Sequence, residues 1–209
     1  MLFTHACFIS FSSDAGPATQ FAKLFYEELK DQLSFLDRQL SIFKYDQSGH
    51  IRNNDDWQQW ILPELNKSAL MITIAAPTYF SSENTCLNEF RCMQHMAAYR
   101  SQLLQNDPAE HDWIIAIRIC DKHPMPLLNN GYQIRDFIDC RINPTAIKLK
   151  KHRATVAEIS DLILRHCQKM QSRVDQLQVG PQIINKMFAP QLAAPSVPDA
   201  FPSWTGVKP

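Results

Sequence analysis

The sequence predicts an α/β protein in which helices cover both faces of a parallel sheet. Three observations lead to this fold class: strand and helix patterns alternate along the chain, the strand runs are short and apolar, and loop-forming residues follow most of them. Such alternation is typical of parallel sheets, because each helix returns the chain to the same end of the next strand. The 209 residues suffice for one domain with a full core and an appendage.

The first strand is expected at residues 6–11, where the apolar run ACFISF ends at a Ser-Ser-Asp-Ala-Gly-Pro loop. Pro17 suits the first turn of the helix that follows. The apolar residues that recur there at helical spacing are Phe21, Leu24, Phe25, Leu29 and Leu33. Residues 40–45, LSIFKY, predict the second strand, and a polar loop follows at 46–56.

A short helix is expected next, with Trp57, Trp60, Ile61 and Leu65 as its apolar residues and with Pro63 tolerated only near its start or as a kink. Residues 69–76 are nearly continuously apolar, which is typical of a strand covered on both faces. The following helix is expected from 85 to 104. Its inward residues are Leu87, Phe90, Met93 and Ala97.

The last third of the chain predicts a fourth strand at 113–120, a proline-rich loop at 121–131 and a short fifth strand within 136–142. The sequence from Thr155 to Glu158 is a capping box, which predicts a helix start. The inner face of that helix is expected to hold Ile159, Leu162, Ile163 and His166. We therefore expect a domain at 1–170 and a Pro-rich C-terminal tail at 171–209, loosely ordered or partner-binding, with one short helix around 182–188.

The composition argues against several classes of function. Lys+Arg and Asp+Glu each number 21, so the chain lacks the basic excess typical of general nucleic-acid or membrane-surface binders. Six cysteines form no C-x-x-C pair, and no histidine stands at metal-ligand spacing. Buried reduced thiols, no metal site, no membrane span and a cytoplasmic location are the expectations.

The most informative stretch runs from 69 to 90, ALMITIAAPTYFSSENTCLNEF. It begins as a buried strand, breaks at Pro77 and enters a helix whose first turns contain Glu89. An acid in this position lies near the carboxyl end of a strand, where open α/β sheets bind ligands. Glu89 is either a functional carboxylate or an acid that favours the helix dipole.

Residues 4–168 resemble a bacterial-type TIR (Toll/interleukin-1 receptor) domain. CFISFSSD is similar to the family's opening box, and SIFKYD with its polar loop and Trp57 is similar to the second strand and BB loop. The segment SSENTCLNEF resembles the Ser-x-x-Cys-x-x-Glu region, with Cys86 and Glu89 at its end. The resemblance implies a flavodoxin-like three-layer fold with a five-stranded parallel sheet. It also implies either cleavage of NAD⁺ or assembly of signalling complexes through TIR–TIR contacts.

By this resemblance Glu89 is the catalytic residue of an NAD⁺ glycohydrolase, and Phe11, Ser12, Trp57 and Asn88 bind the substrate. NAD⁺ is then a substrate, and no cofactor or metal is implied. Family members of this kind serve signalling or bacterial immune defence, including antiviral defence. They act as oligomers that self-associate through their TIR domains, and a separate sensor or effector protein is a further expected partner.

Two positions depart from the family pattern. Thr85 stands where many members have Trp, and Ser12 stands where some NAD⁺-cleaving members have Arg. These departures favour the alternative, a non-catalytic TIR scaffold that uses the loop GHIRNNDD as its contact surface. A third hypothesis is an enzyme similar to nucleoside deoxyribosyltransferases, which the BB-loop and Trp57 spacing fit poorly.

Overall fold

The sheet is parallel throughout, as the sequence predicts. The computed structural model describes residues 2–12, 16–44, 60–76, 79, 85–105, 113–120, 132–178 and 180–188. Within them, five strands run in the order β2-β1-β3-β4-β5, and each neighbouring pair is parallel. The strands are β1 (His5–Phe11), β2 (Ile42–Lys44), β3 (Ser68–Ala75), β4 (Ile114–Arg118) and β5 (Gln133–Asp136). This order is that of the flavodoxin-like fold.

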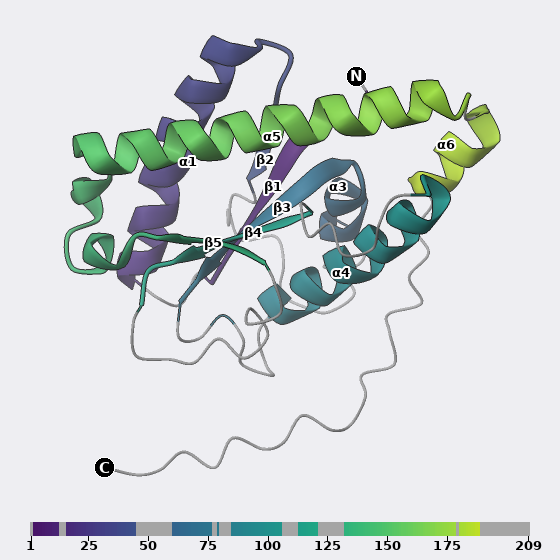
Figure 1. Cartoon of the computed structure of the whole chain (residues 1–209). Helices are drawn as coiled ribbons and strands as arrows, with labels where there is room; N and C mark the ends of the chain where they lie inside the picture. Colours follow the sequence, from purple (N-terminus) through teal and green to yellow (C-terminus); the bar gives the residue numbers. More distant parts are fainter. Residues whose placement is uncertain are drawn as a thin grey trace.

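Helices cover both faces of the sheet, which gives three layers (Figure 1). On one face, α1 (Gly16–Leu36) packs against α5 (Lys150–Gln176), and two 3₁₀ segments, η2 (Ile138–Arg141) and η3 (Pro144–Lys148), adjoin them. On the other face, α4 (Thr85–Leu103) packs against α3 (Leu62–Asn66) and α6 (Pro181–Met187).

The core lies between the sheet and these helices. All eight residues of β3 are buried, which confirms a central strand covered on both faces. The predicted inner face of α1 is also confirmed. Its buried residues are Ala18, Phe21, Ala22, Phe25, Leu29 and Leu33. The rings of Phe21 and Phe25 meet Phe137 at centroid distances of 5.5 and 5.9 Å, so α1 is joined to the chain that follows β5.

Proline fixes where α3 begins. The helix starts at Leu62, so Pro63 lies in its first turn, where no intrahelical N–H bond is lost. This is the placement that the sequence requires. Trp60, just before the helix, is 60% exposed, whereas Ile61 and Leu65 are buried. Trp57 and the polar loop at 46–56 lie outside the described residues.

Two expectations for the last third of the chain are wrong. The fifth strand is at Gln133–Asp136, before the expected 136–142, and η2 occupies most of that range. As an edge strand, β5 has neither the length nor the continuous apolar run of a central strand. The helix expected to open at Thr155 begins at Lys150 instead, and Thr155 Oγ1 bonds back to the Lys151 carbonyl inside it.

The C-terminal part of the described chain packs onto the domain. The boundary expected at 170 falls inside α5, where Met170 and Val174 are buried. The short helix expected at 182–188 is confirmed as α6, Pro181–Met187. Just beyond it, the Phe188 carbonyl accepts a hydrogen bond from Asn66 Nδ2, and the Phe188 ring meets Phe3 edge-on at 5.5 Å. Residues 189–209 lie outside the described part.

The cysteines are buried thiols, as expected: all six are buried and none forms a disulfide. None of the described helices has the length and hydropathy that a membrane crossing would require.

Candidate functional site

The candidate site lies where the strand order reverses. β1 has β2 on one side and β3 on the other, so the connections diverge between β1 and β3. Ligands of open α/β sheets bind beyond the carboxyl ends of the strands at such a point. Ser10, one residue from the end of β1, is in register with Thr73 of β3. Tyr79 follows β3, and Glu89 lies in the first turns of α4.

Three side chains form a hydrogen-bonded relay at this point. Ser10 Oγ donates to Glu89 Oε2, and the Ser10 and Tyr79 hydroxyl oxygens lie 2.7 Å apart. Because the Ser10 proton is directed to Glu89, Tyr79 donates to Ser10 Oγ. The relay therefore runs from the Tyr79 phenol through Ser10 to the Glu89 carboxylate. It connects β1, the segment after β3 and α4.

The relay is nearly shielded from solvent. Glu89 is 6% exposed, Ser10 1% and Tyr79 0%. A carboxylate removed from water is costly unless hydrogen bonds compensate for the lost hydration. A hydroxyl bonded to an ionised acceptor gives a stronger bond than a neutral pair does, so Ser10 both stabilises and orients Glu89.

The electrostatics of the site keep the neighbouring donors protonated. Burial raises the pKa of Tyr79 well above its ordinary value, and the nearby Cys86 and Glu89 add to this shift. Burial, and secondly the charge of Glu89, raises the pKa of Cys92 to about 12. Tyr79 therefore remains a hydrogen-bond donor throughout the physiological pH range, and Cys92 remains a thiol rather than a nucleophilic thiolate.

Three of the four residues predicted to bind the substrate are next to the relay residues in sequence or one residue further along. Phe11 ends β1 and is half-buried; strand alternation directs its side chain to the face opposite Ser10, where it packs against the core. Ser12 follows β1 and is buried. Asn88 is half-buried in α4, directly before Glu89. Trp57 is outside the described residues, so the structure gives it no position.

Ser10 and Tyr79 are site residues that the sequence reasoning missed. The available signal was polarity: Ser10 is a polar residue inside the otherwise apolar run ACFISF. A polar side chain in a buried strand needs a partner, and here the partners are 69 and 79 residues away along the chain.

No protein-family model, curated protein or solved structure that was compared with this chain matches it.

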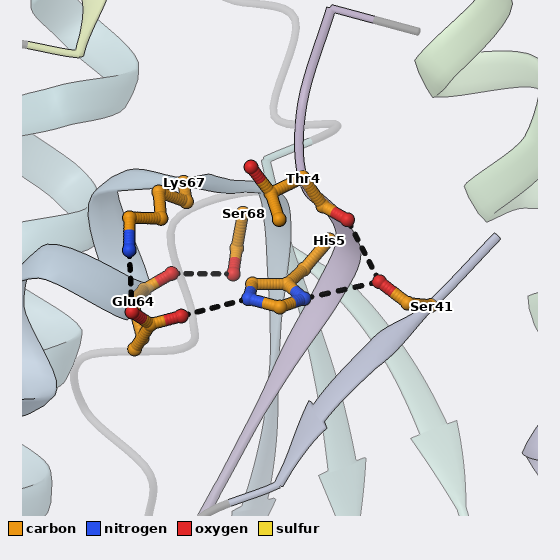
Figure 2. Close-up of polar contacts among 6 residues, drawn as sticks. All are labelled: Thr4, His5, Ser41, Glu64, Lys67 and Ser68. Atoms are coloured by element: carbon orange, nitrogen blue, oxygen red, sulfur yellow. Dashed lines mark hydrogen bonds and ion pairs between the residues drawn. The ribbon is translucent and has the colours of Figure 1, made fainter. Parts of the chain in front are cut away.

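A second polar cluster lies at the other end of β1 (Figure 2). His5 Nε2 is 2.8 Å from Glu64 Oε2 of α3, and His5 Nδ1 is 3.0 Å from Ser41 Oγ. Lys67 Nζ lies 2.6 Å from the other oxygen of Glu64. The combination of Ser, His and Glu raises the question of a hydrolytic triad.

The hydrogen-bond directions argue against a triad. Ser41 Oγ donates to the Thr4 carbonyl at 2.7 Å, so its proton points away from His5 (Figure 2). His5 Nδ1 must then donate to Ser41, whereas a nucleophilic serine has to donate to its histidine. We interpret this cluster as a structural connection between β1, the residue before β2 and α3.

Proposed function

We propose that this protein is a TIR-type NAD⁺ glycohydrolase with Glu89 as its catalytic residue. The observation that supports this most is the oriented Glu89 carboxylate at the β1–β3 switch point, bonded to Ser10. The TIR-like motifs around this residue provide the substrate class.

The chemistry needs only one carboxylate. In NAD⁺ the nicotinamide is already a cationic leaving group, so breaking its bond to the ribose needs no general acid, unlike ordinary glycoside hydrolysis. The transition state has a sugar with oxocarbenium character. A carboxylate close to that positive charge stabilises the transition state more than the ground state, and the effect is larger where water is excluded. Water then adds to the ribose to give ADP-ribose, or a group of the same molecule adds to give a cyclic product.

The relay explains how Glu89 could be held ready for this role. A hydrogen bond from Ser10 fixes one carboxylate oxygen, Oε2, so the other oxygen is oriented as well. Preorganised charge is effective because it does not have to reorient during the reaction. Ser10 is in turn bonded to Tyr79, and the burial of Tyr79 limits the movement of the whole relay.

A non-catalytic TIR scaffold is the second candidate, and the burial of Glu89 favours it. At 6% exposure and with a bond to Ser10, this residue has the surroundings of a structural carboxylate. Exposed apolar side chains are also compatible with association. Phe35 is 88% exposed and Trp60 60%. In both candidates the partners include other TIR domains and a separate sensor or effector protein.

The two candidates differ in one assay. Purified full-length protein is incubated with NAD⁺ in solution and after clustering on beads, and nicotinamide release is measured. The glycohydrolase proposal predicts release by the wild type and loss of release in Glu89→Gln. Glu158→Gln, at an exposed position on α5, is the matched control and should keep the wild-type rate. Absence of release from clustered wild type would favour the scaffold.

A further inference from the structure

A second group of chemically active side chains follows β5, away from the Glu89 relay in the chain. Asp139 and Cys140 lie in η2, and His152 lies in the first turn of α5. One ligand atom from each of these residues lies within 4.8 Å of the other two. The sequence spacing did not predict a metal site here, because the 3₁₀ segments fold the chain back on itself between Cys140 and His152.

The position of His152 is the most informative feature of this cluster. The residue is 4% exposed, and its ring stacks on Phe137 at a centroid distance of 5.0 Å. Its Nε2 atom forms an ion-pair contact of 2.9 Å with Asp139 Oδ1 but makes no hydrogen bond of good geometry. Buried polar atoms are rarely left in this state, and a bound ion is one way in which they are satisfied.

The donor set fits a divalent ion of the zinc type. Imidazole nitrogen, carboxylate oxygen and thiolate sulfur are the three ligand types that Zn²⁺ uses in proteins. One carboxylate and one thiolate also neutralise the two charges of the ion. This matters because Cys140 and His152 are both buried, and a net charge there would be costly.

Two residues of the cluster, Asp139 and His152, line a cavity, whereas Cys140 is buried behind them and is not part of its lining. This cavity of about 530 Å³ is lined by Asp139, His152 and Lys151, together with Asp136, Ile142 and Thr155. Three protein ligands beside a cavity leave a fourth tetrahedral position for water, as in zinc sites that are not purely structural.

We propose that Asp139, Cys140 and His152 bind one divalent ion of the zinc type, with a fourth position open to the neighbouring cavity. This inference is independent of the NAD⁺ proposal, because it shares no residue with the Glu89 relay.

Binding of the ion requires two changes at the site: the Lys151 ammonium has to leave Asp139, and the Cys140 thiol has to lose its proton. The Lys151 ammonium is ion-paired with Asp139 Oδ2 and is 63% exposed, so it can move into solvent when a cation binds. Binding therefore forms one metal–sulfur bond and releases one proton to solvent, and the affinity rises with pH.

The test uses Co²⁺ as a spectroscopic substitute for Zn²⁺, added to purified full-length protein. The proposal predicts one equivalent of Co²⁺ bound, with a thiolate-to-cobalt charge-transfer band that excess Zn²⁺ removes. Cys140→Ser should abolish the band. Cys167→Ser changes another buried cysteine, on α5, and should retain it.

Two further variants address folding and competition. Asp139 has a half-exposed side chain, so Asp139→Asn should fold normally, which circular dichroism checks, and should weaken binding about tenfold or more. Lys151→Gln removes the competing cation and should tighten binding. Absence of the band in the wild type, or a band that survives in Cys140→Ser, would overturn the proposal.

Discussion

Ser10 in β1 donates a hydrogen bond to Glu89 in α4, across 79 residues of sequence. The bond joins the strand at the centre of the switch point to the helix that begins after β3. It is the contact that turns an acid near a helix start into a carboxylate with a defined orientation.

Removing the Ser10 hydroxyl should impair catalysis without unfolding the protein. In Ser10→Ala, Glu89 loses the donor that orients it, and the predicted fall in kcat is about tenfold, which corresponds to about 1.4 kcal/mol. Tyr79→Phe removes only the outer hydrogen bond of the relay and should cost less. Nicotinamide release is measured at saturating NAD⁺ for both variants. Equal activities of Ser10→Ala and wild type would show that Glu89 does not depend on this bond.

Arg100 should be a major contributor to stability. Its guanidinium is fully buried, donates to the Ser68 carbonyl at 2.9 Å and to the Asn66 carbonyl, and lies 5.0 Å from the centroid of Phe3. A lysine cannot reproduce this combination of forked hydrogen bonds and stacking. Arg100→Lys is therefore expected to lower the free energy of unfolding by about 1–3 kcal/mol.

The matched control for this variant is Arg153→Lys. Arg153 is 58% exposed and forms a surface ion pair with Glu28 at 3.3 Å, so the change should stay within about 0.5 kcal/mol. Urea denaturation of both variants provides the comparison. If the two substitutions have the same effect, Arg100 is not the specific connection between α4, the carbonyls of Asn66 and Ser68, and the ring of Phe3.

The cluster in Figure 2 should make the stability of the folded protein depend on pH in the acidic range. Partial burial acts to raise the pKa of Glu64, but hydrogen bonds from Lys67 and His5 outweigh it and lower this pKa below 4.5. A carboxyl whose pKa is lower in the folded state stabilises the protein above the unfolded-state value. That stabilisation is lost as the pH falls from about 4.5 through the folded-state pKa.

Glu64→Gln should remove this contribution. The expected loss is about 0.5–1 kcal/mol at pH 7, because the pair is close to solvent. The difference between variant and wild type should shrink as the pH is lowered from about 4.5. Thermal denaturation of both proteins at a series of pH values measures this difference in stability. A difference that stays constant down to pH 3 would contradict the assignment.

Much of the fold could be predicted from the sequence because its central strands consist of nearly continuous apolar residues. The run at 69–76 matches β3 within one residue at each end. β5 could not be found in this way, since its four residues include Gln133, Arg135 and Asp136 and its pairing depends on β4. The capping-box pattern at Thr155 does not mark the start of α5, because the same residues also fit a helix interior, where Thr155 Oγ1 donates to the Lys151 carbonyl.

The candidate site could be predicted only in part. Glu89 was identifiable because its place after a strand is a property of nearby sequence. Its partners Ser10 and Tyr79 come from distant segments, and single-sequence patterns do not record which distant hydroxyls meet. The same limit applies to Asp139, Cys140 and His152, which come together only through the 3₁₀ turns between β5 and α5.

NAD⁺ consumption by clustered full-length protein, wild type beside Glu89→Gln, decides whether Glu89 is a catalytic residue. The substitution keeps the size of the side chain and its ability to accept a bond from Ser10, and it removes the charge. We predict nicotinamide release by the wild type and a loss of about 10²–10³-fold in the variant, typical of removing one group that stabilises transition-state charge. Equal release by both proteins, or none from clustered wild type, would contradict the account.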